Sequence, residues 1–273
     1  MGGLAATSEN PTPTDVALTD AMEAYDPAAG TWTAAAPLPT ARVGLAAVTG
    51  RDGRIYAIGG SPNEQFPPSD VVEVYTPGTD TWETAAPLPI PLADVSATTD
   101  SAGNIYAFGG DVTEIYDADT KTWKTAPPMP TPRERAVVTA GTDDRIYVIG
   151  GFPASGDAAG PLRTVEVYTP ATGRWSSAAS LPHPAGQAAG VTALDGRIFV
   201  FGGNPDDGAA PSAAAYVYSP ATDDWATVTP MPRPRNTHSA AIGPDGRIYL
   251  VGGDQGTTDA ELGVLRNVDA YTP

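Results

Sequence analysis

Arginine is the residue type in this sequence that is best suited to bind a ligand. Arg42, Arg133 and Arg235 each lie three residues after a proline that recurs along the chain, with Arg135 and Arg233 close by. The planar guanidinium group binds carboxylates and other anions through parallel hydrogen bonds. We therefore predict an anion-binding or peptide-binding site that contains these five arginines.

A structural role is the alternative for the same arginines. The chain has 32 acidic and 15 basic residues, which gives a net charge of -17. In such an acidic protein an arginine easily finds a carboxylate nearby, or packs on an aromatic ring. The sequence leaves both interpretations open.

The two histidines, His183 and His238, complete the set of candidate site residues. His183 stands between two prolines and is expected to be exposed, whereas His238 begins an apolar segment near Arg235 and is predicted to belong to the binding site. The adjacent Asp206 and Asp207 are the best candidates for calcium, although such pairs are more typical of turns. We predict no metal site, no cofactor and no catalytic residue, and binding is favoured over catalysis.

The composition excludes several other functions. The chain has no cysteine, so disulfides, thiolate catalysis and cysteine-ligated metals are excluded. A net charge of -17 disfavours nucleic-acid binding and favours a monomer. No apolar run is long enough to span a membrane, and residues 1–15 lack the features of a signal peptide. The sequence does not indicate the cellular compartment. Secretion or surface display would require that the natural chain begins upstream of Met1.

A repeat organises the whole sequence. Each unit contains a tyrosine, a tryptophan seven residues later, a proline seven residues after that, and a glycine pair that begins 27 residues after the tryptophan. The glycine pairs are Gly59-Gly60, Gly109-Gly110, Gly150-Gly151, Gly202-Gly203 and Gly252-Gly253. The aromatic pairs, which we expect to pack between repeats, are Tyr25/Trp32, Tyr75/Trp82, Tyr116/Trp123, Tyr168/Trp175 and Tyr218/Trp225.

Each unit is predicted to form four antiparallel strands. In the unit at 43–82, a small apolar strand reaches an Asp-Gly turn, a second strand ends at the glycine pair, and two more strands follow. The proline after the tryptophan then ends the sheet. The length variation falls between the glycine pair and the next tyrosine, in the loops 4–20, 61–70, 152–163, 204–213 and 254–265.

The glycine pairs, the Tyr/Trp spacing and the period near 50 resemble the kelch motif, and the resemblance covers residues 21–271. It implies an all-β, kelch-type β-propeller of four-stranded antiparallel blades. Five clear repeats and a partial one allow two arrangements: six blades, one of them incomplete, or five blades. We expect a single domain over 21–273. Residues 1–20 are predicted to form a loop or tail, which would be the remnant of a truncated blade if the chain is a fragment.

The kelch resemblance also implies a function, because family members mostly bind other proteins. Strand alternation brings the variable loops and the inter-blade linkers to one end of each blade. We predict a non-catalytic scaffold that binds a protein, peptide or carbohydrate there. The alternatives are a sugar-active enzyme similar to sialic-acid mutarotases, and a recognition or spacer domain of a larger surface protein.

Overall fold

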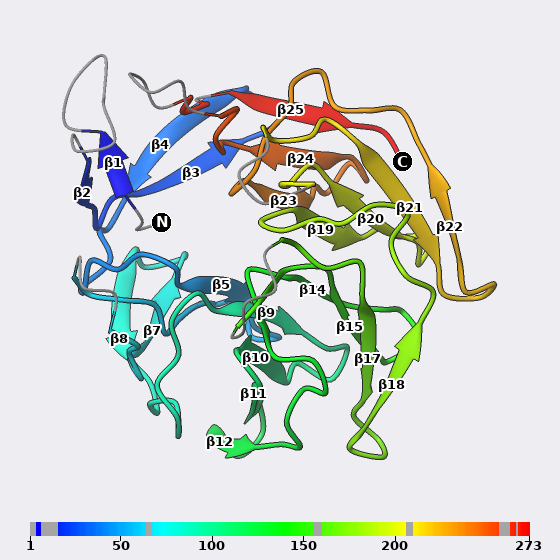
Figure 1. The fold of residues 1–273 in the computed structure, drawn as a ribbon. Coiled ribbons are helices and arrows are strands. Elements are labelled where there is room, and N and C mark those ends of the chain that lie inside the picture. The colour runs from blue at the N-terminus through cyan, green and yellow to red at the C-terminus, as the bar shows by residue number, and fades with distance from the viewer. Residues whose placement is uncertain are drawn as a thin grey trace. The chain divides into compact units, whose positions relative to one another are not determined.

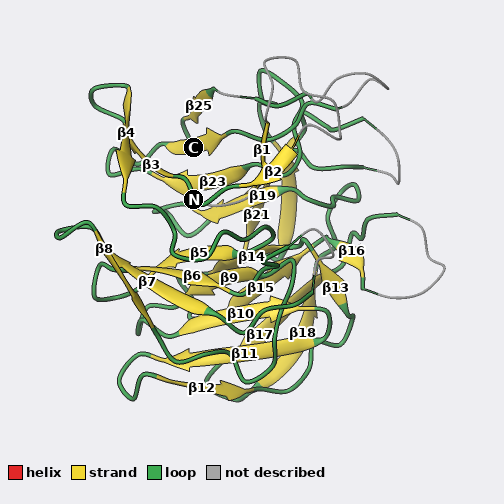
Figure 2. Ribbon diagram, turned by 90° about the vertical axis from the view of Figure 1, so that its left-hand side faces the viewer, coloured by secondary structure: helices red, strands yellow, loops and turns green. Residues whose placement is uncertain are grey.

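The computed structural model describes residues 4–6, 16–63, 67–154, 160–205, 210–256, 263–265 and 267–273. All regular elements in these ranges are strands, as Figure 2 shows, and the predicted all-β class is confirmed. A helix that could span a membrane is not found in the described ranges. The chain comprises two compact units, Met1–Pro128 and Met129–Pro273, so the division falls inside the region predicted as one domain.

The first unit contains two complete antiparallel sheets and a hairpin (Figure 1). The sheets run in chain order, and β5 pairs with β6, β6 with β7 and β7 with β8. Their strands are β5 (Ala46–Thr49), β6 (Ile55–Ile58), β7 (Val72–Thr76) and β8 (Thr81–Thr84), then β9 (Ser96–Thr99), β10 (Ile105–Gly109), β11 (Val112–Asp117) and β12 (Thr122–Thr125). The hairpin consists of β3 (Met22–Asp26) and β4 (Thr31–Ala35), which are strands three and four of a partial repeat.

Residues 1–20 differ from the loop or tail that we predicted. The structure pairs β1 (Leu4–Ala6) with β2 (Val16–Leu18) in an antiparallel ribbon. The short apolar segments LAA and VAL provide the strand residues, and they lie outside the repeat whose spacing guided the prediction.

The second unit repeats the four-stranded sheet twice and ends in a three-stranded sheet. The complete sheets are β14 (Val137–Ala140), β15 (Ile146–Ile149), β17 (Val165–Thr169) and β18 (Arg174–Ala178), then β19 (Ala189–Thr192), β20 (Ile198–Phe201), β21 (Ala215–Ser219) and β22 (Asp224–Thr227). The last sheet holds β23 (Ser239–Ile242), β24 (Ile248–Val251) and β25 (Val268–Tyr271). The short strands β13 (Arg133–Glu134) and β16 (Phe152–Pro153) pair at the end of the first sheet.

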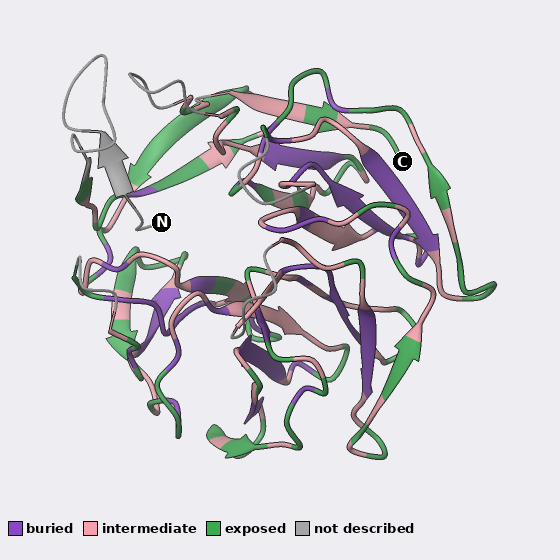
Figure 3. Ribbon diagram, viewed as in Figure 1, coloured by how far each residue is buried: buried purple, intermediate pink, exposed green. Residues whose placement is uncertain are grey.

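Burial explains the pattern of residues along the strands. The second and third strands, such as β6, β7, β15 and β17, are mostly buried, whereas the fourth strands β8 and β12 are largely exposed (Figure 3). Continuous apolar runs such as IYVI suit strands that are covered on both faces. Within each unit, apolar clusters join neighbouring sheets: one joins β5–β8 to β9–β12, and another joins β14–β18 to β19–β22.

The repeated residues hold these sheets together. Tyr75 and Trp82 are cross-strand partners with ring centroids 5.2 Å apart, and the Trp82 indole donates a 2.9 Å hydrogen bond to the Ala36 carbonyl. The glycine pairs permit close backbone contact. At Gly150, whose φ is 64°, a Cβ atom would lie 2.3 Å from the Ala185 carbonyl oxygen, so only glycine fits.

Trp32 differs from the other tryptophans of the repeat in its exposure. Trp32 is 42% exposed, and its ring lies against Tyr25 of its own hairpin with centroids 5.0 Å apart. Trp175 is only partly buried, and its ring lies 5.3 Å from that of Tyr168 in its own sheet. The contact between tryptophan and tyrosine within a sheet is therefore common to all five repeats.

Candidate functional site

Arg133, one of the three arginines at the repeated position, is buried in an internal network. Its Nη2 lies 2.6 Å from a Glu166 carboxylate oxygen on β17, and Nη1 donates to the Gly150 and Thr164 carbonyls at 3.2 and 2.9 Å. The Thr131 hydroxyl also donates to Glu166, at 2.7 Å. Burial lowers the pKa of Arg133, and the charge of Glu166 acts in the opposite direction. This network ties the inter-blade linker to the third strand of the sheet that follows.

Arg42 and Arg235 occur in the same arrangement. Both side chains are completely buried; Arg42 lies 3.2 Å from Glu73 on β7, and Arg235 pairs with Asp269 on β25. Arg235 also donates to the Gly252 carbonyl at 3.0 Å. The contacts of all three arginines therefore match the structural interpretation, since each guanidinium is already paired with a carboxylate of its own sheet.

The two sheets without this arginine differ from each other. In the sheet β9–β12, Leu92 takes the position of the arginine while the acid remains as Glu114, which is buried and accepts hydrogen bonds of 3.0 and 3.1 Å from Thr125. Burial raises the pKa of Glu114. In the sheet β19–β22, Ala185 and Tyr216 replace both partners, so an ion pair is one of several ways to fill this position.

A second repeated position lies two residues further along each linker, and its side chains are more accessible. It is held in the left-handed backbone conformation in every repeat, a region that favours glycine. The residues are Gly44 (φ 66°), Asp94 (46°), Arg135 (53°), Gln187 (56°) and Thr237 (51°). Four of the five are polar residues other than glycine, which marks this position as a candidate for function.

In the second unit these residues lie side by side and form a polar row. The Gln187 amide donates to the Arg135 carbonyl at 3.1 Å, and the Thr237 amide donates to the Gln187 carbonyl at 2.9 Å. Side-chain hydrogen bonds extend the row: Asn204 donates to Gln187 at 3.0 Å, and Asn236 donates to Asn204 at 2.8 Å. We call these five residues the polar row; Arg135 and Thr237 are exposed, and the other three are partly exposed.

The polar row lies at the end of each sheet that carries the variable loops. Gly186 forms an isolated bridge with Asn204, and Asn236 forms one with Asp254, so the linkers pair with the first residues of the loops 204–213 and 254–265. We predicted that linkers and loops share this end. The predicted site included Arg135 of the polar row, but not Gln187, Asn204, Asn236 or Thr237. Parts of the loops, including Asp206 and Asp207, lie outside the described residues.

The other predicted site residues lie outside the polar row. Arg233 and His183 are exposed. His238 is 7% exposed and packs near Gly202 and Gly253. Burial and the charge of Arg235 lower the pKa of His238 to about 3, so this side chain is neutral at physiological pH. Clusters of three or more His, Asp or Glu side chains suited to a metal ion are not found in the described ranges.

Comparisons with known proteins identify the fold and the family. The model of the KLHDC2/KLHL20/DRC7 Kelch-repeats domain matches residues 44–253. A solved structure described as "Structure of YjhT" is similar with a TM-score of 0.75 over 99% of this chain and 94% of that chain, at 16% sequence identity, which shows a shared β-propeller fold. The search of curated proteins finds no match. Kelch propellers commonly serve as protein-binding scaffolds, and this chain belongs to the KLHDC2/KLHL20/DRC7 Kelch-repeats domain family.

Proposed function

We propose that this protein is a non-catalytic scaffold whose second unit binds a partner protein through the polar row. The observation that carries the proposal is the left-handed backbone at Arg135, Gln187 and Thr237. A non-glycine residue in this conformation costs about 1–2 kcal/mol. Gly44, at the same position in the first unit, fits the geometry without that cost.

The position of the polar row favours a role in recognition. It lies on linkers supported by rigid sheets and borders loops whose length varies between repeats. Such loops on a constant framework are where proteins concentrate their binding residues. Buried Arg–acid pairs hold two of these linkers, those of Arg133 and Arg235, in place from below, so they support the row without touching a partner.

The chemistry of the row suits an extended peptide segment with an acidic side chain. Gln187, Asn204 and Asn236 offer amide groups that can both donate to and accept from a peptide backbone. Arg135 offers a guanidinium group to a carboxylate. We therefore infer that the partner presents a polar segment with at least one aspartate or glutamate.

The proposal is tested with a displayed random-peptide library and a glycan array, both probed with the intact chain. Peptides enriched in acidic residues are expected, and the triple variant Arg135→Gly, Gln187→Gly, Thr237→Gly is expected to bind them at least tenfold more weakly. Asp144→Gly is the matched control, because Asp144 also has a left-handed backbone (φ 59°) but lies in the turn between β14 and β15, at the opposite end of the sheet. Equal binding by the triple variant, or selection of glycans alone, would contradict the proposal.

A further inference from the structure

The turns between third and fourth strands contain a repeated residue that differs in charge from one sheet to another. This residue stands two positions before each tryptophan and always has a left-handed backbone. The five residues are Gly30 (φ 68°), Asp80 (53°), Lys121 (57°), Gly173 (63°) and Asp223 (52°). The conformation is constant, so the side chain is the variable part.

In the sheet β19–β22 this residue is an aspartate that closes the junction with the preceding sheet. One oxygen of Asp223 accepts a 2.7 Å hydrogen bond from the Tyr218 hydroxyl and a 2.8 Å hydrogen bond from the Ala179 amide. Tyr218 packs on Tyr147 of the preceding sheet with ring centroids 5.7 Å apart. The carboxylate therefore satisfies two donors, one from each sheet.

Asp80 makes the same two interactions in the first unit. Its carboxylate accepts hydrogen bonds of 2.7 Å from the Tyr75 hydroxyl and 2.7 Å from the Ala36 amide. Two independent copies of the turn thus place a carboxylate where a tyrosine hydroxyl and a backbone amide converge. The repeat itself shows which chemical group this position accepts.

In the sheet β9–β12 the aspartate is replaced by Lys121. The corresponding donors are the Tyr116 hydroxyl and the Ala86 amide, and the Trp123 indole bonds to the Ala86 carbonyl at 2.9 Å just as Trp225 bonds to Ala179 at 2.8 Å. An ammonium group cannot accept their hydrogen bonds. The Tyr116 side chain interacts with that of Tyr56, and within the described part of the chain no carboxylate takes the place of Asp80 or Asp223.

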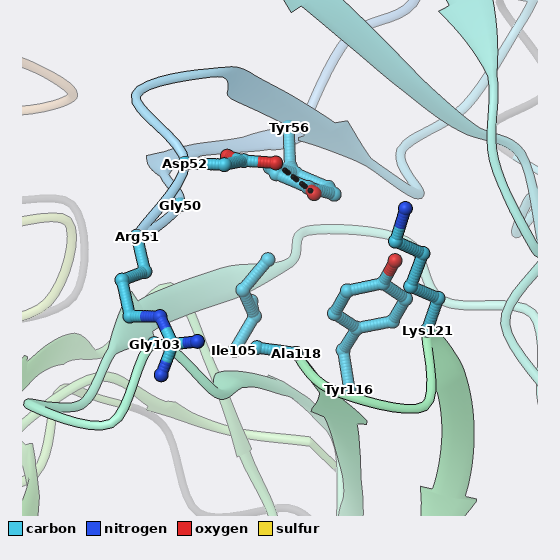
Figure 4. A pocket seen from close by; sticks show the side chains of 9 residues that line it. All are labelled: Gly50, Arg51, Asp52, Tyr56, Gly103, Ile105, Tyr116, Ala118 and Lys121. Atoms are coloured by element: carbon cyan, nitrogen blue, oxygen red, sulfur yellow. Dashed lines mark hydrogen bonds between the residues drawn. The ribbon is translucent and has the colours of Figure 1, made fainter.

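A cavity of about 210 Å³ lies beside Lys121, as Figure 4 shows. Tyr116 and Lys121 rise from one side, and Asp52 and Tyr56 lie on the other, joined by a 3.2 Å hydrogen bond. Asp52 is already paired with Arg54 at 2.6 Å, so its charge is largely compensated. The cavity lies at the turn end of the sheets, opposite the linkers and variable loops of the same unit.

The lining of the cavity combines positive charge with an apolar wall. Lys121 supplies the positive charge, because Arg51 is paired with Asp119 at 3.3 Å. Lys121 is one of only two lysines in a chain with a net charge of -17. Ile105 and Ala118 supply apolar surface. The volume is below the range of about 300–1,000 Å³ that is usual for drug-sized ligands, which limits the occupant to one ring or a short chain.

We propose that this cavity binds a small organic carboxylate, which accepts from the Tyr116 hydroxyl as the Asp80 and Asp223 carboxylates accept from Tyr75 and Tyr218 in the sister sheets. Lys121 neutralises the charge of the ligand carboxylate. Its apolar body lies on Ile105 and Ala118. This site is independent of the polar row in the second unit.

Titration calorimetry or ligand-observed NMR with sodium benzoate, and with neutral benzamide for comparison, tests the proposal on the intact chain. Millimolar binding of benzoate at one site is expected, with benzamide at least tenfold weaker. Lys121→Asp restores the internal carboxylate and should abolish benzoate binding while raising the melting temperature. Lys124→Asp makes the same charge change on the neighbouring exposed strand β12 and should retain binding.

Tyr116→Phe provides a second test that leaves all charges in place, and it should weaken benzoate binding several-fold. Undiminished binding by Lys121→Asp would overturn the proposal. Equal loss in Lys121→Asp and Lys124→Asp would also overturn it, because the effect would then be one of total charge. Absence of benzoate binding to the wild-type chain would overturn it directly.

Discussion

Removal of Arg133 tests whether the buried Arg–acid pairs stabilise the propeller framework. Arg133→Ala leaves the Glu166 carboxylate, which is 6% exposed, without its partner at 2.6 Å. It also removes the donors to the Gly150 and Thr164 carbonyls. Loss of one partner of a buried ion pair typically costs about 3–5 kcal/mol. We expect the free energy of unfolding to fall by that amount.

The neighbouring sheet provides a matched rescue. Ala185 and Tyr216 hold the same two positions there without any charge. Arg133→Ala combined with Glu166→Tyr should therefore recover most of the lost stability, because no unpaired charge remains buried. Replacement of buried ion pairs by packed neutral residues is often neutral or stabilising.

Urea denaturation followed by tryptophan fluorescence measures both variants. At roughly 2–4 °C for each kcal/mol, Arg133→Ala should also lower the melting temperature by on the order of 10 °C. A cost below about 1 kcal/mol, as for exposed ion pairs, would refute the reasoning. So would a double variant that is no more stable than the single one.

Four further outcomes follow from the structure. Because the pKa of His238 is lowered from 6.5 to about 3, the unfolded chain takes up a proton first as pH falls. The free energy of unfolding should therefore drop by at most about 1.4 kcal/mol per pH unit between these values, and His238→Leu should flatten this dependence in urea titrations. Glu114→Gln should raise stability at pH 7 and lose that effect near pH 4, since burial raises the pKa of Glu114 and disfavours its charged form in the folded state. Gln187→Gly should leave the free energy of unfolding unchanged or raise it by up to about 1–2 kcal/mol, and it should weaken peptide binding. Asp223→Ala should lower stability by about 1–3 kcal/mol, because it leaves the Tyr218 hydroxyl and the Ala179 amide without their acceptor.

The repeat spacing was sufficient to predict the fold. Glycine pairs, tyrosines, tryptophans and prolines recur at fixed distances because each has a similar structural task from sheet to sheet. Gly150, for example, has to lie against the Ala185 carbonyl, and Trp82 has to reach the Ala36 carbonyl. The same spacing could not show that Trp32 is largely exposed, because exposure depends on which sheet covers the ring. The ribbon formed by β1 and β2 was missed because its residues belong to no repeat.

The candidate site was only partly predictable. The sequence showed that arginines recur at one position, but not which carboxylate each of them meets, since Glu166 lies 33 residues from Arg133. A comparison of the third strands would have given a signal, because an acid follows the arginine in three repeats, as Glu73, Glu166 and Asp269. Arg135 was predicted as a site residue, but the rest of the polar row gave no such signal, because Arg135, Gln187 and Thr237 share a backbone conformation and not a chemical type.

Hydrogen exchange of the chain with and without a selected acidic peptide tests the central claim most directly. The account predicts new protection in the linkers 131–137, 183–189 and 233–239, which carry or flank the polar row. It predicts no change in the turns 141–145 and 193–197 at the opposite end of the same sheets. Protection of those turns, with the linkers unchanged, would contradict binding at the polar row.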